Sequence, residues 1–181
     1  MKATGIVRRI DDLGRVVIPK EIRRTMRIRE GDPLEIYTDR DGEVIFKKYS
    51  PVGEMASFAS QYVETLHKIC AMSVVVTDRD SIICCAGVPK KEYADKRLSE
   101  DFEQIIEARS MYIHKNGAPC VQVAEGNTAF VKYAMPIISE GDIVGCVACV
   151  SNDSSMVTDP NSTEAKLIQT ASSFLGRQFE G

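Results

Sequence analysis

The chain has 181 residues, of which 44% are hydrophobic and 27% are charged, and its formal net charge is -3. This is the composition of an ordinary soluble globular protein, which excludes a largely disordered chain, and no apolar run approaches the roughly 18 residues of a membrane span. Residues 1–5 lead into an alternating, arginine-bearing segment instead of the apolar stretch of a secretory signal. We therefore expect a cytoplasmic protein.

The charge is divided unevenly along the chain. Residues 1–50 contain 12 Lys/Arg and 9 Asp/Glu, a net of +3, whereas residues 51–181 contain 11 and 17, a net of -6. Such asymmetry indicates that one domain meets a polyanion and the other does not. We therefore predict a first domain of residues 1–50 and a second domain of residues 51–181, with a boundary at Ser50-Pro51-Val52-Gly53.

The chain begins with two predicted strands joined by a tight turn. Thr4 to Ile10 alternates in polarity, and Arg15 to Ile18 is β-branched, so both segments favour strands. Between them, residues 11–14 end in a glycine that accommodates a positive φ.

A short helix and a hairpin complete the first domain. Pro19 fits the first turn of a helix that runs to about Arg27, because proline needs no N–H there. Leu34 to Thr38 and Glu43 to Lys48 flank residues 39–42, whose Asp-Gly ending is a strong hairpin signal.

Fifty residues with four short strands bury little surface, and domains of this size are marginal unless another chain completes the core. The sequence therefore predicts an obligate homodimer through residues 1–50.

The second domain alternates helices and strands in the order αββαβββα. Asn161 is the expected cap of its last helix, because Glu164 follows three residues later. The fold class is therefore α+β, with an antiparallel sheet flanked by helices. The expected helices cover residues 54–70, 99–109 and 163–179, and the expected strands cover residues 73–77, 82–86, 129–138 and 142–150, with one more near Val121.

The cysteines predict neither disulfides nor a metal site. Cys146 and Cys149 resemble a zinc motif, but an odd spacing on a strand places the two sulfurs on opposite faces. We read the cysteines as reduced core thiols, and we expect no metal and no cofactor. The six cysteines are Cys70, Cys84, Cys85, Cys120, Cys146 and Cys149.

The helix after Pro19 carries a narrow basic arc, opposite an apolar side that includes Ile22. No acidic residue lies on this arc, and four like charges side by side favour an external anion. Arg8, Arg9 and Arg15 on the preceding strands extend the surface. The arc itself consists of Lys20, Arg23, Arg24 and Arg27.

The arc has two other interpretations, a solvated face and a site for RNA or single strands. Charged helix faces are often simply solvated, although the absence of interleaved acids argues against this here. RNA and single strands are disfavoured, because stacking platforms need more aromatic residues than this domain has. Duplex DNA is the better partner, since guanidinium groups bind phosphates and guanine edges bidentately.

The segments Thr4-Gly-Ile-Val-Arg-Arg-Ile10, Leu13-Gly-Arg-Val-Val-Ile-Pro19 and Glu21-Ile-Arg-Arg-Thr25 closely resemble the AbrB-type swapped-hairpin DNA-binding family. The resemblance covers about a quarter of the chain, and it implies that two chains interleave their hairpins. Lys20 and Arg27 depart from the commonest family pattern, which bears on the target sequence. The implied DNA-binding residues are Arg8, Arg15, Arg23 and Arg24, with Lys2, Arg9, Lys20 and Arg27 as neighbouring basic contacts.

The topology of the second domain resembles a GAF-type sensory domain. The combination of both domains resembles a family of transcription regulators of spore development. This implies an activator and repressor associated with the nucleoid, and a homotetramer formed through helices such as residues 54–70. A pocket for a small effector would be lined by parts of residues 82–88 and 117–132, and its ligand is unknown. Alternatively, the domain is only a scaffold for assembly.

An enzyme is the rival hypothesis, although we expect none. Some GAF domains reduce methionine sulfoxide with paired cysteines, and Cys84, Cys85 and Cys120 would be the candidates for such a thiol enzyme or redox sensor. No nearby basic residue or helix N-terminus marks them as thiolates. Core packing is the favoured reading of these residues.

Overall fold

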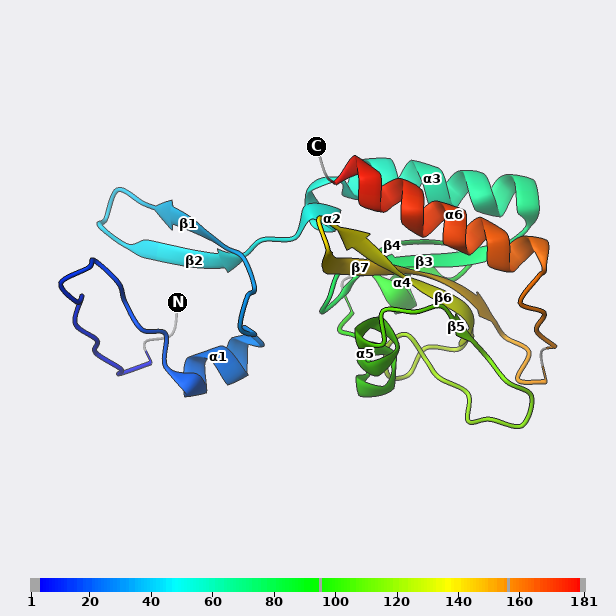
Figure 1. Cartoon of the computed structure of the whole chain (residues 1–181), viewed down its shortest axis with the longest axis horizontal. Coiled ribbons are helices and arrows are strands. Elements are labelled where there is room, and N and C mark those ends of the chain that lie inside the picture. Colours follow the sequence, from blue (N-terminus) through cyan, green and yellow to red (C-terminus); the bar gives the residue numbers. More distant parts are fainter. Residues whose placement is uncertain (1–3, 95, 156, 180–181) are drawn as a thin grey trace. The chain divides into compact units, whose positions relative to one another are not determined.

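The computed structural model describes residues 4–94, 96–155 and 157–179. The chain divides into two compact units, residues 1–49 and residues 50–181 (Figure 1). None of the helices in the described ranges is long and apolar enough to cross a membrane. Each unit is described separately below.

In its described residues, 4–49, the N-terminal unit contains one helix, α1 (Lys20–Met26), and one hairpin of strands β1 (Leu34–Thr38) and β2 (Val44–Lys48). The hairpin is antiparallel, with Leu34 opposite Lys48 and Thr38 opposite Val44. The predicted hairpin is therefore confirmed, although β2 begins one residue later than expected.

The two predicted strands at the start of the chain are not strands in the single chain. The turn between them does form, because the N–H of Gly14 donates to the carbonyl of Asp11 (3.0 Å) and the N–H of Asp11 donates to the carbonyl of Arg15 (3.0 Å). Residues 4–10 and 15–18 have no assigned strand partner among the described residues of this chain. A strand needs a neighbouring strand to pair its backbone groups, and alternation of side chains alone does not supply one.

Helix α1 is shorter than predicted at both ends. Pro19 lies before the helix as its N-cap, where its carbonyl accepts from the N–H of Arg23 (2.9 Å). Arg27 ends the helix in the left-handed conformation (φ 51°), so it does not continue the helical period. The prediction that Arg27 completes the basic arc as a helical residue is therefore wrong.

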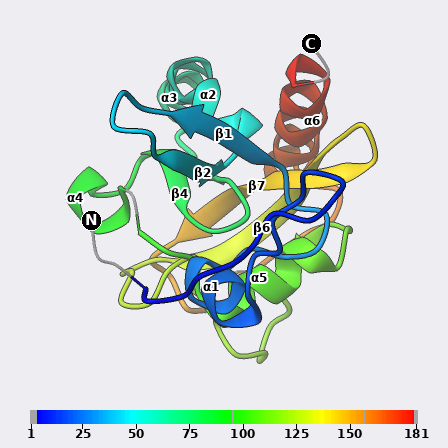
Figure 2. The ribbon, with the colours of Figure 1, turned by 90° about the vertical axis from the view of Figure 1, so that its left-hand side faces the viewer.

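The C-terminal unit is a five-stranded antiparallel sheet with helices on both faces (Figures 1 and 2). The strand order in the sheet is β4-β3-β7-β6-β5. This confirms the α+β class. The strands are β3 (Ser73–Thr77), β4 (Ile82–Ala86), β5 (Tyr112–Ile113), β6 (Phe130–Ser139) and β7 (Asp142–Ser151), and the helices are α2 (Pro51–Glu54), α3 (Ala56–Cys70), α4 (Lys90–Tyr93), α5 (Glu100–Glu107) and α6 (Thr163–Gln178).

Several details of this unit differ from the prediction. The helix predicted over residues 54–70 is interrupted at Met55, which separates α2 from α3. Val121 is not in a strand but accepts one hydrogen bond from the N–H of Val131 (2.8 Å), and the edge strand is β5 instead. The cap of α6 is Ser162, whose Oγ accepts from the N–H of Ala165, so the assignment of Asn161 as the cap is wrong.

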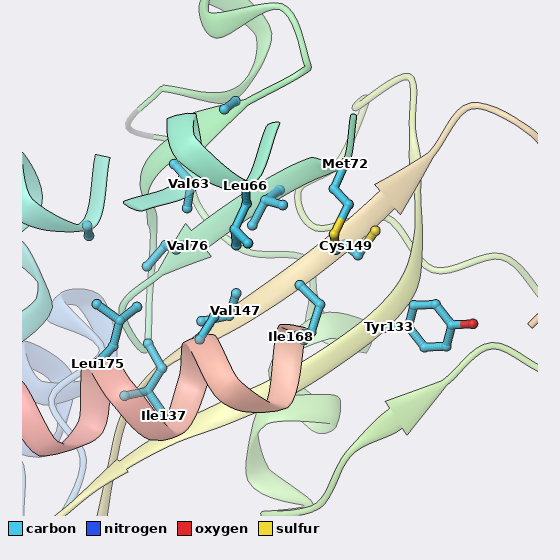
Figure 3. Packing of buried hydrophobic residues seen from close by; sticks show 14 of the residues in the cluster. Val63, Leu66, Met72, Val76, Tyr133, Ile137, Val147, Cys149, Ile168 and Leu175 are labelled. Carbon is cyan, nitrogen blue, oxygen red and sulfur yellow. The ribbon is translucent and has the colours of Figure 1, made fainter. Parts of the chain in front are cut away.

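Helices α3 and α6 cover one face of the sheet, and α4 and α5 cover the other (Figure 2). Side chains such as Leu66, Ile168 and Leu175 pack on the first face (Figure 3). Cys149 belongs to this first core and Cys146 to the second, which confirms that the two sulfurs lie on opposite faces. The sheet is therefore buried on both sides.

Candidate nucleic-acid interface

The N-terminal unit has no buried residue among its described residues, 4–49. Val7, Leu13 and Val17 are 88%, 70% and 70% exposed. Exposed apolar side chains in this number are normally covered by another chain. One chain by itself therefore leaves this unit without a core.

Basic side chains are exposed on the same unit. The predicted site residue Lys2 lies outside the described residues, and Arg27 is half-buried. The remaining predicted residues are exposed, and they are Arg8, Arg9, Arg15, Lys20, Arg23 and Arg24.

Helix α1 brings three of these residues together. Lys20, Arg23 and Arg24 stand at positions i, i+3 and i+4, which lie on one side of a helix. Ile22 is half-buried, so the helix has a partly covered side and an exposed basic side. Arg27 leaves this arrangement because of its left-handed backbone.

Arg15 lies directly after the tight turn and is held by it. Its Nε donates to Asp11 Oδ2 (2.8 Å), while the N–H groups of Arg15 and Leu13 donate to Asp11 Oδ1 (2.7 and 3.1 Å). The backbone hydrogen bond from Arg15, followed by its guanidinium, lowers the pKa of the Asp11 carboxyl. The turn therefore carries an ionised carboxylate and an ordered guanidinium side by side.

A second ion pair, which the sequence does not predict, fixes the end of α1. Lys48 Nζ lies 3.3 Å from Asp32 Oδ2 and donates to the carbonyl of Arg27 (3.0 Å). The same carboxylate oxygen accepts from the N–H of Arg29 (2.8 Å). Because Arg27 and Lys48 are 21 residues apart, no local pattern could have revealed this contact.

Burial disfavours the thiolate form of four cysteines in the C-terminal unit. Burial raises the pKa of Cys84 and of Cys149 to about 12, and it also raises the pKa of Cys85 and Cys146. A thiol with such a pKa is not a thiolate at neutral pH, and the thiolate is the nucleophile. No group of three or more potential metal ligands occurs in the described part of the chain.

The C-terminal unit has a groove of about 550 Å³ beside α5. Part of the predicted pocket, residues 117–132, contributes to its lining, but residues 82–88 do not. Residues 82–86 form β4, which lies at the opposite edge of the sheet from β5. The lining residues are Asp101, Gln104, Ile105, Ala108, Ser110, Met111, Tyr112, Ala118, Pro119 and Val121.

The model of the family "Stage V sporulation protein T C-terminal, transcription factor" matches residues 54–180. The family model "Antidote-toxin recognition MazE, bacterial antitoxin" matches residues 7–54.

The chain is similar to several proteins of Bacillus subtilis. Stage V sporulation protein T is 50% identical over 99% of both chains. The transition state regulatory protein AbrB is 65% identical over 51 residues, 28% of this chain and 52% of its own length.

A solved structure supports the fold of the C-terminal unit. The GAF domain/HD domain protein from Geobacter sulfurreducens has a TM-score of 0.50 at 16% identity, over 74% of this chain and 95% of that one. At this identity the likeness bears on the fold alone. The C-terminal unit has the GAF-like fold that the sequence predicts.

Proposed function

The chain belongs to the family of stage V sporulation protein T, so it is a transcription factor, and we propose that it regulates genes of spore development. In this proposal, residues 1–50 bind duplex DNA, and residues 51–181 form a sensory and assembly domain. The protein acts as both activator and repressor, at the nucleoid.

The observation that carries the DNA-binding site is the exposed basic side of α1. Lys20, Arg23 and Arg24 are exposed together, and Arg15 projects from the neighbouring turn. Phosphate contacts from such residues supply most of the affinity for DNA, and a few arginines that reach base edges supply preference. Arg8, Arg9, Arg27 and Lys2 complete the proposed contact set.

We infer that this surface works as part of a homodimer. Residues 4–18 have no assigned strand partner among the described residues of their own chain, and Val7, Leu13 and Val17 are exposed. Interleaving with a second copy would pair these segments and bury their valines and leucines. A dimer would also present the two basic helices to two neighbouring DNA segments.

The C-terminal unit provides a surface for pairing two dimers into a tetramer. Phe174 on α6 packs against Phe58 and Tyr62 on α3, with ring centroids 5.8 and 5.4 Å apart. Phe174 remains 39% exposed, so aromatic surface is left uncovered along these helices. Linking two dimers raises the effective concentration at a second DNA site.

The groove beside α5 is the place we assign to a small effector. Its residues come from α5, the segment 108–111, β5 and the loop 118–121, and most are apolar. Pockets of this size and character are typical of small-molecule sites. If no ligand binds there, the unit serves assembly alone.

We also propose that the protein is not a thiol enzyme. Methionine sulfoxide reduction needs a thiolate nucleophile, and the raised pKa of Cys84 and Cys85 opposes one. Alkylation followed by mass spectrometry of peptides would show the exposed Cys70 modified first at pH 7. Rapid modification of Cys84 and Cys85 instead would support the hypothesis of a thiol enzyme.

The direct test of the proposed function is fluorescence anisotropy of a labelled AT-rich duplex at several salt concentrations. The full chain, residues 1–50 alone and residues 51–181 alone are titrated separately. We expect the first two to bind with a steep salt dependence and the third not to bind. Absence of binding by all three would contradict the proposal.

A further inference from the structure

Two turns of the N-terminal unit have nearly the same construction. In residues 11–15, Asp11 Oδ1 accepts the N–H groups of Leu13 (3.1 Å) and Arg15 (2.7 Å). In residues 39–43, Asp39 Oδ1 accepts the N–H groups of Asp41 (3.0 Å) and Glu43 (2.9 Å). In each turn the fourth residue is a glycine with positive φ. Both carboxylates therefore close a turn with one oxygen.

The second oxygen distinguishes the two turns. Asp11 Oδ2 accepts from Arg15 Nε (2.8 Å), whereas Asp39 has no basic side-chain partner among the described residues. The Asp11 side chain is 34% exposed and that of Arg15 is 69% exposed. A turn of this type needs only one carboxylate oxygen. The hydrogen bond from Arg15 Nε to the second oxygen is therefore not required to form the turn.

The hydrogen bond to Asp11 leaves the two terminal nitrogens of the Arg15 guanidinium available for a ligand. Asp11 engages only Nε, and the two terminal nitrogens of Arg15 have no partner in the described ranges. An arginine side chain loses much rotamer freedom when it binds, and a fixed guanidinium loses less. The terminal nitrogens are the pair of donors that binds a guanine edge or a phosphate bidentately.

A carboxylate beside DNA also repels the phosphates, so Asp11 lowers affinity unless it has a compensating role. We propose that Asp11 is a positioning residue for Arg15, which orients the guanidinium for sequence-selective contact with duplex DNA. This inference rests on the proposed function. It adds that selectivity depends on an acidic residue outside the basic contact set.

The test compares Asp11→Asn with the matched control Asp39→Asn in the full chain. Asparagine keeps the oxygen that closes each turn, and both variants remove one negative charge. In Asp11→Asn, an amide N–H₂ faces Arg15 Nε, and two donors cannot bond to each other. Only this variant therefore loses the guanidinium contact.

The probes are a duplex selected from a randomised pool by the wild-type chain and a shuffled duplex of the same base composition. The measured quantity is the ratio of the two affinities. Since an exposed ion pair has a modest free energy, Asp11→Asn should lower this ratio by about threefold. Asp39→Asn should leave the ratio unchanged, although the removed charge tightens binding to both duplexes.

A second variant separates positioning from an effect on the turn. Arg15→Lys retains the backbone hydrogen bonds to Asp11 but has no fork of donors. It should lower the ratio by itself, and adding Asp11→Asn to it should cause no further fall. In the wild-type chain, the NMR signal of the Arg15 Nε–H should exchange more slowly with water than in Asp11→Asn.

Three results would overturn the inference: an unchanged ratio in Asp11→Asn, an equal fall in Asp39→Asn, or an equal further fall when Asp11→Asn is added to Arg15→Lys. The inference is also overturned if the wild-type chain binds the selected and the shuffled duplex with equal affinity. If the wild-type chain binds no duplex at all, the proposed function fails first, and that outcome is distinct from the others.

Discussion

The two units place similar β-branched pairs in opposite environments. Val75 and Val76 on β3 are both fully buried, whereas Val16 and Val17 are 46% and 70% exposed. Strand β3 lies between β4 and β7, and each face of the sheet is covered by helices. The segment containing Val16 and Val17 has no assigned strand neighbour in the described part of its own chain. Burial therefore depends on the available partners and not on the residues alone.

The comparison extends to charge. The unit that lacks a core is basic, and the unit with a complete core is acidic. A short, basic, uncovered segment is suited to binding another chain and a polyanion, while a self-sufficient sheet is suited to sensing or assembly. The following predictions test this contrast, beginning with the largest effect.

Phe102→Ala should be the most damaging change, because Phe102 is fully buried between α5 and the sheet. Removing a buried phenyl ring costs about 3–5 kcal/mol of unfolding free energy. Urea unfolding followed by circular dichroism measures it. The control Glu107→Ala, at an exposed site on the same helix, should change stability by no more than about 0.5 kcal/mol. Similar losses in the two variants would contradict the assigned core.

Dilution should unfold residues 1–50 but not residues 51–181. If a second copy completes the first unit, a hundredfold dilution lowers its apparent stability by about 2.7 kcal/mol. Circular dichroism at several protein concentrations would detect the shift. If the stability of residues 1–50 does not vary with protein concentration, this unit does not depend on a second copy, and the two units do not differ in this respect.

Arg23→Ala and Arg24→Ala should each weaken binding to duplex DNA by about tenfold and reduce the salt slope by about 1. Arg40→Ala is a matched control, since Arg40 is exposed in the same unit but lies in the β1–β2 turn. Anisotropy titrations at several salt concentrations measure both quantities. Equal losses in all three variants would show that only total charge matters.

Ser162→Ala should have the smallest effect, about 1 kcal/mol, because it removes the cap of α6. Asn161→Ala, the site expected from sequence, should change the stability of the C-terminal unit by no more than about 0.5 kcal/mol. Thermal unfolding of residues 51–181 compares them. A larger loss of stability in Asn161→Ala than in Ser162→Ala would indicate that Asn161 is the cap.

Local patterns in the sequence determined the parts of this protein that depend on nearby residues. The Asp-Gly signal located the β1–β2 hairpin, the helical period placed Lys20, Arg23 and Arg24 on one side of α1, and the odd spacing of the two cysteines on β7 separated their sulfurs. Each of these results follows from backbone geometry over a few residues.

Tertiary structure decided what distant residues contribute. Lys48 contacts the end of α1 across 21 residues, and Arg27 leaves the basic arc in a left-handed cap. Strand β5, instead of a strand at Val121, pairs with β6, and the groove forms beside α5 without β4. Pairing and enclosure depend on which segments become neighbours, and periodicity within one segment carries no information about its neighbours.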